Sequence, residues 1–224
     1  LHYPLRRQRQ MCIRDRYNIL YQNMGPQHWW PADSNIEMML GAILVQNTNW
    51  RNADLALQSL KEATDFNPKY ILNMPLEDLQ MVIKSSGFYK NKAKAIHALF
   101  LWLDQHHFDY NGIVTQYRDD LRQELLSIRG IGSETADVLI VYIFGGVEFI
   151  PDSYTRRLYA KLGYANTDSY DKFKKEIQLP STFTNQDANE FHALLDSFGK
   201  NYFNIKNGTH YTFLDSYFES SVND

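Results

Sequence analysis

The sequence predicts an all-α protein. Apolar residues recur at helical spacing, cap residues precede many of the apolar runs, and no alternating strand pattern of useful length competes. The 44% apolar and 14% aromatic content of the 224 residues indicates a packed globular protein. No apolar run is long enough to suggest a membrane span.

Cap and stop signals divide the chain into helices. Ser34 and Glu37 form a capping-box pattern, and Pro68 stands at a first helical position after Asn67. Gly87 is placed to end a helix. The predicted helices cover about 35–45, 51–62, a short segment from 68, 76–86, 90–107, 117–128, 133–144, 153–162, 170–177 and 186–204.

Residues 1–16 differ from the rest of the chain. They hold five arginines against the single Asp15, and they lack apolar periodicity. A basic DNA-binding arm or a transit peptide would fit this composition, but we expect a non-native or disordered extension outside the fold. The net charge of the chain is −3 and becomes more negative without this segment. Any nucleic-acid binding must therefore use a local basic patch and backbone N–H groups.

The segment 126–152 carries the most specific pattern. Gly130-Ile131-Gly132 joins two predicted helices, and Ser133 is a good N-cap for the second one. Glycine reaches backbone conformations closed to other residues, and free N–H groups at a helix start suit a phosphate. Asp152 follows about twenty residues later. This order predicts a protein that holds a nucleic-acid backbone and acts beside it.

The run Ile128-Arg129-Gly130-Ile131-Gly132-Ser133-Glu134-Thr135-Ala136, followed by Pro151-Asp152, resembles the helix-hairpin-helix (HhH-GPD) superfamily of DNA glycosylases, which includes endonuclease III. The resemblance extends from about Trp29 to Lys206. It implies a two-lobed helical fold with the DNA cleft between the lobes. One lobe, 34–146, would be a helical barrel containing the hairpin, and 17–33 plus 147–224 would form the second lobe.

The resemblance assigns Asp152 as the catalytic residue. A fixed carboxylate near C1′ stabilises the positive charge that builds on the sugar, and it can orient or deprotonate the attacking water. Taken alone, Asp152 would more often be a plain N-cap. Strand-cutting relatives place a lysine where Glu134 stands here, and a carboxylate cannot form their Schiff base. Glu134 is also a favourable first-turn residue.

Several further residues resemble the base pocket of the family, closest to its cluster-free 3-methyladenine glycosylase branch. Gln46 would fill the gap left by the flipped base, or it belongs to a polar turn at a helix end. Aromatic faces would attract the cationic ring of an N-alkylated purine, although tryptophans also pack in cores. The pocket candidates are Gln46, Trp29, Trp30, Pro31, Trp50 and Lys200. Lys200 could equally be a solvated residue.

Backbone contacts to DNA are expected at the hairpin and at a second loop. Lysines that open a helix are electrostatically unfavourable, which hints at phosphate binding, although charge runs are usually just solvated. The expected backbone-contact residues are Arg129, Gly130, Ile131, Gly132, Ser133, Lys90 and Lys92.

Cofactor chemistry is not expected. Endonuclease III carries a four-cysteine iron–sulfur loop, whereas Cys12 is the only cysteine in this sequence. The histidines show no metal-ligand spacing, so no metal site is expected, but the hairpin carbonyls could hold a monovalent cation. We expect a monomer that binds double-stranded DNA containing a damaged base, with no membrane contact, in the cytoplasm of a bacterium.

The sequence thus predicts a monofunctional DNA N-glycosylase of base excision repair that removes an alkylated purine such as 3-methyladenine. Three alternatives remain open. The protein could be a glycosylase for mismatched adenine or thymine, or an endonuclease III-like enzyme that cuts the strand with another lysine. It could also be a module that binds damaged DNA without catalysis.

Overall fold

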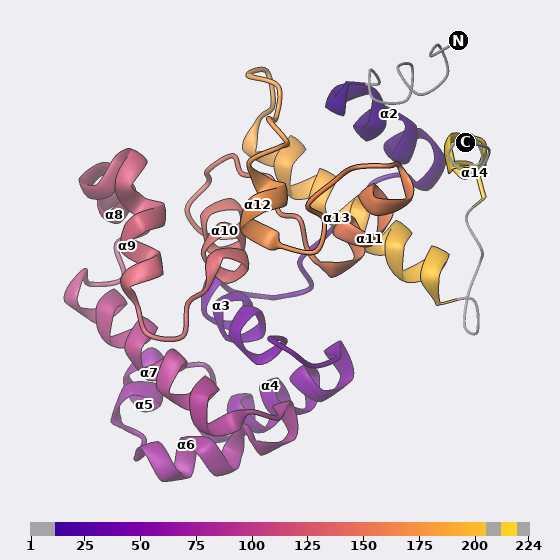
Figure 1. The fold of residues 1–224 in the computed structure, drawn as a ribbon. Coiled ribbons are helices and arrows are strands. Elements are labelled where there is room, and N and C mark those ends of the chain that lie inside the picture. The colour runs from indigo at the N-terminus through magenta and orange to yellow at the C-terminus, as the bar shows by residue number, and fades with distance from the viewer. Residues whose placement is uncertain (1–11, 205–211, 219–224) are drawn as a thin grey trace. The chain divides into compact units, whose positions relative to one another are not determined.

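The computed structural model describes residues 12–204 and 212–218, and every regular element in these ranges is a helix (Figure 1). This confirms the all-α fold class predicted from the sequence. The chain divides into two compact units. We call Trp30–Gly146 the hairpin unit, and the described residues of Leu1–Trp29 and Val147–Asp224 the aspartate unit. Residues 30–33 were predicted to lie in the second lobe, but in the structure they belong to the hairpin unit.

The helices of the hairpin unit start where the sequence provides caps. Side-chain oxygens of Ser34, Asn49 and Asn67 each accept a backbone N–H of the following first turn. The predicted capping box is half formed, because Glu37 accepts the N–H of Asp33 instead. The elements are α3 (Asn35–Leu44), α4 (Trp50–Thr64), α5 (Pro68–Asn73), α6 (Leu76–Val82), η1 (Lys84–Ser86), α7 (Tyr89–Gln105), α8 (Tyr110–Tyr117), η2 (Arg118–Asp120), α9 (Leu121–Ser127) and α10 (Ser133–Tyr142).

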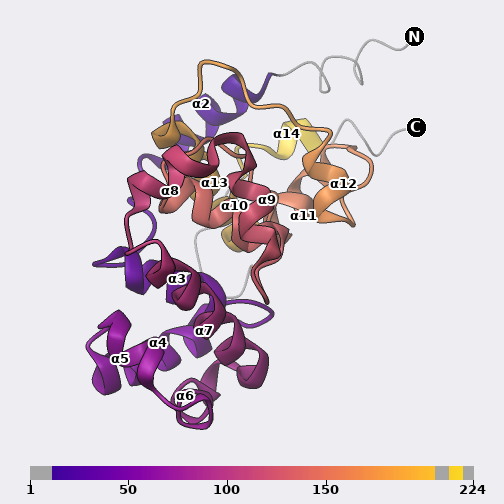
Figure 2. The same ribbon diagram turned by 90° about the vertical axis from the view of Figure 1, so that its left-hand side faces the viewer.

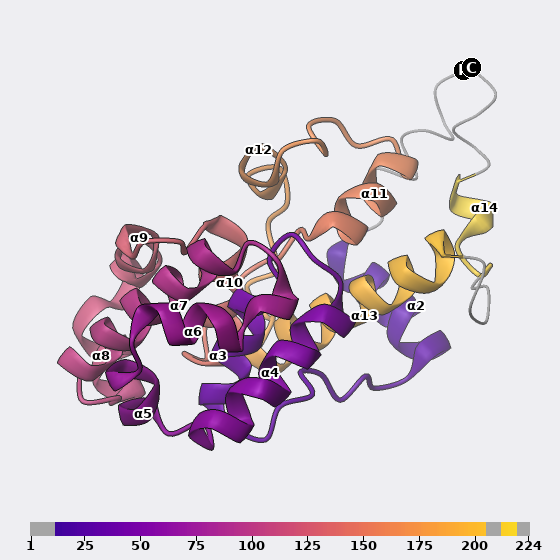
Figure 3. The ribbon, with the colours of Figure 1, turned by 90° about the horizontal axis from the view of Figure 1, so that it is seen from below.

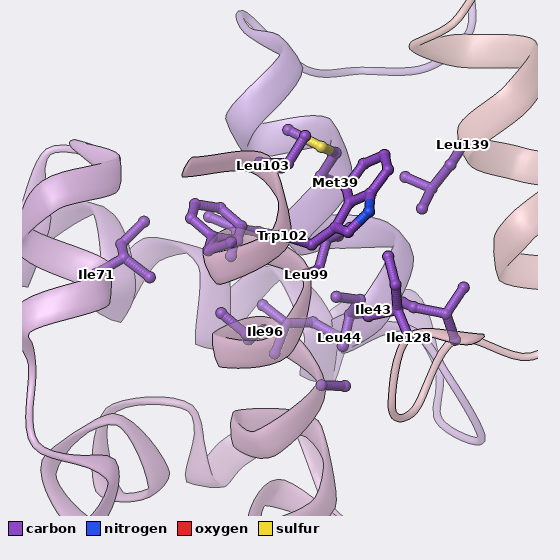
Figure 4. Close-up of a cluster of buried hydrophobic side chains, with 14 of the residues drawn as sticks. Met39, Ile43, Leu44, Ile71, Ile96, Leu99, Trp102, Leu103, Ile128 and Leu139 are labelled. Atoms are coloured by element: carbon purple, nitrogen blue, oxygen red, sulfur yellow. The ribbon is translucent and has the colours of Figure 1, made fainter. Parts of the chain in front are cut away.

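Helix α7 lies at the centre of the core of the hairpin unit. Its Ile96, Leu99 and Leu103 follow helical spacing and are fully buried. They lie against Met39 and Ile43 of α3 (Figure 4). Helices α5 and α6 also pack on α7, and both contact α4 (Figure 2). The core therefore holds α7 in one place relative to the turns around it.

Two predicted helices of this unit are interrupted. The single helix predicted for 117–128 is wrong, because Arg118 adopts a φ of +47° and separates α8 from α9. A left-handed residue cannot continue a right-handed helix. The sequence prediction also missed α8, which begins at Asp109 as N-cap. The segment 76–86 similarly divides into α6 and the 3₁₀ turn η1.

The aspartate unit is built around α13. Its elements are α2 (Ile13–Met24), α11 (Ser153–Lys161), α12 (Tyr170–Lys174), α13 (Asn185–Phe203) and α14 (Asp215–Phe218). Helix α13 starts at a capping box between Thr184 and Asp187, and it lies beside both α11 and α2 (Figure 3). Phe191, Leu194 and Phe198 form its buried stripe and pack into a largely aromatic core.

The prediction that residues 1–16 all lie outside the fold is wrong for the last four of them. Residues 13–16 form the first turn of α2, and the guanidinium of Arg16 is buried against the rings of Tyr159 and Tyr164. Arg14 forms an ion pair with Asp187 at 3.2 Å. These arginines bind partners that are far away in sequence, which is why the local composition misled. The rest of the predicted extension, residues 1–11, lies outside the described residues.

Candidate functional site

The two glycines of the hairpin differ in why their positions suit glycine. Gly130 has a φ of +84°, and a Cβ added to it would lie 2.5 Å from the Cβ of Ala95 in α7. Only glycine fits both the conformation and the space. Gly132 has an ordinary φ of −92°, and none of the described atoms lies within 4 Å of an added Cβ. Gly130 is therefore required by the fold, whereas Gly132 leaves the surface of the turn open.

The helix after the hairpin has no side-chain cap. Ser133 was predicted as its N-cap, but it is the first helical residue, and the cap position belongs to Gly132. Gly132 has no side chain and therefore makes no side-chain cap hydrogen bond to this first turn. Buried Asp137 of α10 binds Arg122 of α9 with an Nε–Oδ1 distance of 2.8 Å. The hairpin is thus braced from below while the start of α10 can still receive an anion.

Gln46 lies against the hairpin. It follows α3, and its Nε2 donates to the carbonyl of Gly130 at 3.2 Å and to Oγ1 of Thr135 at 2.9 Å. The structure thus brings the turn after α3 and the glycine turn together. To enter a vacated base stack, Gln46 would have to release these two hydrogen bonds.

The lysines before α7 have different surroundings. Lys92 was predicted to contact the DNA backbone, but its side chain is buried, and its Nζ donates to the carbonyls of Leu44 and Ser86. Burial lowers the pKa of Lys92 to about 8. Lys92 therefore cannot reach a phosphate in this structure. Lys90 and Arg129 are exposed.

Tryptophans 30 and 50 pack together in the hairpin unit. Their ring centroids are 5.6 Å apart in an edge-to-face arrangement, and Trp30 makes a similar contact with Tyr142 at 5.7 Å. Both tryptophans are partly exposed, and Pro31 beside them is exposed. This cluster is partly core, as the simpler sequence interpretation held, and partly a surface of stacked rings.

Asp152 is both buried and fixed. It is the N-cap of α11, and its Oδ1 accepts the N–H of Thr155 at 2.6 Å. The residue is 7% exposed, and its Oδ2 lies 3.9 Å from Nε2 of His192. The N-cap interpretation is therefore correct. Because capping uses Oδ1, the second carboxylate oxygen is directed toward α13.

One face of α13 presents three ionisable groups at a spacing of four residues, namely His192, Asp196 and Lys200. Nζ of Lys200 lies 2.6 Å from Oδ2 of Asp196 and 5.1 Å from the centroid of the Trp29 ring. The Trp29 ring in turn meets His192 edge to face at 5.6 Å. Of the predicted pocket residues, Trp29 thus lies against His192, the neighbour of Asp152, and Lys200 lies over the Trp29 ring.

The sequence reasoning missed His192 and Asp196. Their spacing with Lys200 would have placed all three on one helix face, but nothing local links them to Asp152, which lies 40 residues earlier. The close approach of α11 and α13 makes this link. At Gly199 of α13, an added Cβ would lie 2.5 Å from the Cβ of Tyr154 in α11.

Comparison with known proteins decides the family. The HhH-GPD superfamily base excision DNA repair protein model matches residues 40–181. The chain belongs to this superfamily. A protein of Methanocaldococcus jannaschii, provisionally named a DNA repair glycosylase, is 36% identical over 184 residues, which are 80% of this chain and 83% of that protein.

Two solved structures show the same helical fold. The H. pylori 3-methyladenine DNA glycosylase MagIII, bound to 1,N6-ethenoadenine, aligns with a TM-score of 0.63 and 26% identity over 88% of this chain and 97% of its own. A non-covalent complex of endonuclease III with DNA aligns with a TM-score of 0.67 and 25% identity over 85% of each chain. The protein is thus a DNA repair glycosylase of the HhH-GPD superfamily, similar to endonuclease III.

The ionisable groups of α13 in this glycosylase are shifted by burial. Burial lowers the pKa of His192 to about 4, so the ring is neutral at pH 7. Burial, together with the charge of Asp152, raises the pKa of Asp196 to about 6, while Lys200 acts in the opposite direction. Asp152 therefore faces a neutral imidazole and a carboxyl group that titrates close to neutral pH.

These shifts predict opposing effects on stability between pH 4 and pH 6.5. The unfolded chain takes up a proton that folded His192 refuses, so this term lowers stability as the pH falls from 6.5 to 4. Folded Asp196 keeps a proton that the unfolded chain loses, so its term lowers stability as the pH rises from about 4 to 6. Asp196→Asn removes the second term. Relative to wild type, the free energy of unfolding of Asp196→Asn should therefore rise by on the order of 2–3 kcal/mol as the pH increases from 4 to 7.

Urea unfolding at pH 4 and pH 7 measures this gain. Exposed Asp168, changed to Asn, serves as the control and should follow wild type at both pH values. A constant difference between Asp196→Asn and wild type at the two pH values would contradict the raised pKa.

The donor set of the glycosylase does not fit an iron–sulfur cluster, because the sequence supplies one cysteine rather than four. Among the described residues, no group of three or more His, Cys, Asp or Glu side chains is placed to hold a metal ion. Glu134, which the sequence resemblance aligns with the lyase lysine, is exposed in the first turn of α10. In the same ranges, no helix combines the length and apolar character needed to cross a membrane.

Proposed function

We propose that this glycosylase is monofunctional and hydrolyses the N-glycosidic bond of a flipped alkylated purine, such as 3-methyladenine, leaving the strand intact. The observation that carries the proposal is that His192 lies beside both Asp152 and Trp29, and that Lys200 lies over the Trp29 ring, all in the aspartate unit. A fixed carboxylate, an aromatic face and an ammonium group paired with Asp196 thus lie close to one another.

Asp152 supplies the electrostatic part of the reaction. Loss of the base builds positive charge on C1′, and a carboxylate that is already oriented stabilises this charge without reorganisation. The N-cap bond to Thr155 orients Oδ1, and Oδ2 remains to face the sugar or to align the attacking water. The neutral His192 beside Oδ2 does not cancel the negative charge of Asp152.

The surroundings of Glu134, Lys92 and Lys200 support the proposed absence of strand cleavage. Glu134 cannot form a Schiff base. Lys92 is buried and bonded to two carbonyls, and Lys200 is paired with Asp196. Water is therefore the nucleophile in the proposed reaction, and the product is an abasic site in an intact strand.

The preference for a cationic base is supported by the surroundings of Trp29. Its ring already accepts one cation, the ammonium of Lys200, at 5.1 Å from its centroid. An alkylated purine could take this place if Lys200 turned fully to Asp196, to which it is bonded at 2.6 Å. MagIII, one of the similar solved proteins, is named as a 3-methyladenine DNA glycosylase.

A panel of end-labelled duplexes tests the proposal, with 3-methyladenine, 1,N6-ethenoadenine, uracil, 8-oxoguanine or a mismatched adenine at one site. We expect the enzyme to release free base from the 3-methyladenine duplex without alkali, and strand breaks to appear only after alkali treatment. We expect no covalent adduct with abasic DNA under borohydride. Breaks without alkali, or a trapped adduct, would contradict the monofunctional mechanism. Preferred release of a neutral base would contradict the role given to Trp29.

A further inference from the structure

Lys92 is a buried lysine that the proposed reaction does not use. It is 2% exposed, in the first turns of α7. Its Nζ donates to the carbonyl of Leu44 at 2.8 Å and to the carbonyl of Ser86 at 2.7 Å. Placing an ammonium in a core is costly unless it is hydrogen-bonded, so the two bonds offset a real penalty. A methionine would fill the same space without this cost.

The two carbonyls belong to the ends of two different elements. Leu44 is the last residue of α3, and Ser86 is the last residue of η1. Carbonyls at helix ends have no partner further along the helix and carry partial negative charge, so a cation suits them. One ammonium therefore joins two turns that are 42 residues apart in the sequence.

Each of these turns continues into a side chain suited to an opened base stack. Gln46 lies two residues after Leu44, and Phe88 lies two residues after Ser86. Phe88 is 68% exposed and has a φ of +48°, which is unusual for an aromatic residue. A large exposed ring held in a strained turn is suited to stack on a base.

The same part of α7 also supports the hairpin. Ala95, three residues after Lys92, is the residue that a Cβ on Gly130 would strike, and the Gly130 carbonyl accepts the amide of Gln46. The turn after α3, the turn before α7 and the glycine hairpin are thus attached to one short stretch of α7, all within the hairpin unit.

We propose that Lys92 is a positioning residue for base extrusion, which contacts no DNA and fixes the Gln46 and Phe88 turns through the carbonyls of Leu44 and Ser86. This inference rests on the proposed function in one respect, namely that a base must leave the stack. It does not depend on which base is released. Without the ammonium, the two turns separate from each other and meet the duplex out of register.

The test measures extrusion apart from chemistry. The fluorescence of 2-aminopurine next to the target base reports unstacking, and single-turnover release is followed with the best substrate of the lesion panel. Both are measured on a fully paired duplex and on a gapped duplex, in which the nucleotide opposite the target is missing. In the gapped duplex little free energy is needed to open the base pair.

For Lys92→Met, we expect extrusion and release on the paired duplex to fall by about 10- to 100-fold, as for a misplaced positioning group. On the gapped duplex we expect a change of less than about 3-fold, because the opening step has been removed. Lys92→Gln, which keeps two N–H donors without the charge, should recover part of the loss. Gln46→Ala and Lys92→Met should be non-additive in combination.

Exposed Lys69 of α5, changed to Met, is the matched control and should behave as wild type on both duplexes. Equal losses on paired and gapped DNA, or a parental rate on both, would overturn the proposal. Loss of the folded circular dichroism signal in both Lys92 variants would also overturn it, because Lys92 would then be a general core residue. If wild type unstacks 2-aminopurine but releases no base, the proposed function fails while the role of Lys92 is still measured.

Discussion

Asp152→Asn is expected to lower single-turnover base release by about 100- to 1,000-fold, the range for loss of one electrostatic stabiliser of a transition state. Asparagine is as good an N-cap as aspartate, so the bond to Thr155 and the start of α11 should survive. The substitution therefore removes the charge and little else. Binding to the damaged duplex, measured by fluorescence anisotropy, should stay close to that of wild type.

The matched control for this variant is Asp109→Asn. Asp109 is also an N-cap, with its Oδ1 accepting the N–H of Gly112 at 2.9 Å in the hairpin unit. We expect parental base release from this control. Parental release from Asp152→Asn itself would remove Asp152 from the reaction and leave a helical protein that binds DNA by its hairpin.

Gly130→Ala is expected to destabilise the hairpin and weaken DNA binding together. A positive φ costs an alanine about 1–2 kcal/mol, and overpacking against the Cβ of Ala95 adds about 1–3 kcal/mol. At about 2–4 °C per kcal/mol, the melting temperature should fall by roughly 4–20 °C. The displaced turn also loses its bond from Gln46, so affinity for duplex DNA should fall at all sequences tested.

Gly132→Ala is the matched variant at the same turn, and it should leave the stability of the fold unchanged. Its φ of −92° is open to alanine, and none of the described atoms lies within 4 Å of the added Cβ. Its melting temperature should stay within about 2 °C of wild type, as for a surface substitution. A Gly130→Ala protein that melts with wild type would show that the close contact with α7 is not maintained in solution.

Some elements of this protein were within reach of sequence reasoning because their signals are local. The caps at Ser34 and Asp152 and the place of Pro68 at a helix start depend on residues within one turn, and all three hold in the structure. The Gly-Ile-Gly turn is similar, since a left-handed backbone demands glycine whatever surrounds it. The break at Arg118 escaped because no glycine or proline marks it.

The candidate site was harder to predict from the sequence, because the role of a charged residue depends on partners that the sequence does not show. Lys92 looked like one more lysine of a phosphate-binding run, and the carbonyls that bury it come from two distant turns. Arg16 looked like part of a basic extension, and the rings that cover it lie more than 140 residues later. Whether a cation binds DNA or a carbonyl depends on what the fold brings to it.

The sequence by itself determined the helical class, the family and the positions of the hairpin and of Asp152, because these follow from local backbone preferences and from residue spacing. Only the tertiary structure decided that His192 lies beside Asp152 and Trp29, and that Lys200 lies between Asp196 and the Trp29 ring. It also decided that Lys92 joins two turns. Burial and hydrogen bonding set the charge and reach of these groups. Both arise only when helices distant in the chain pack together.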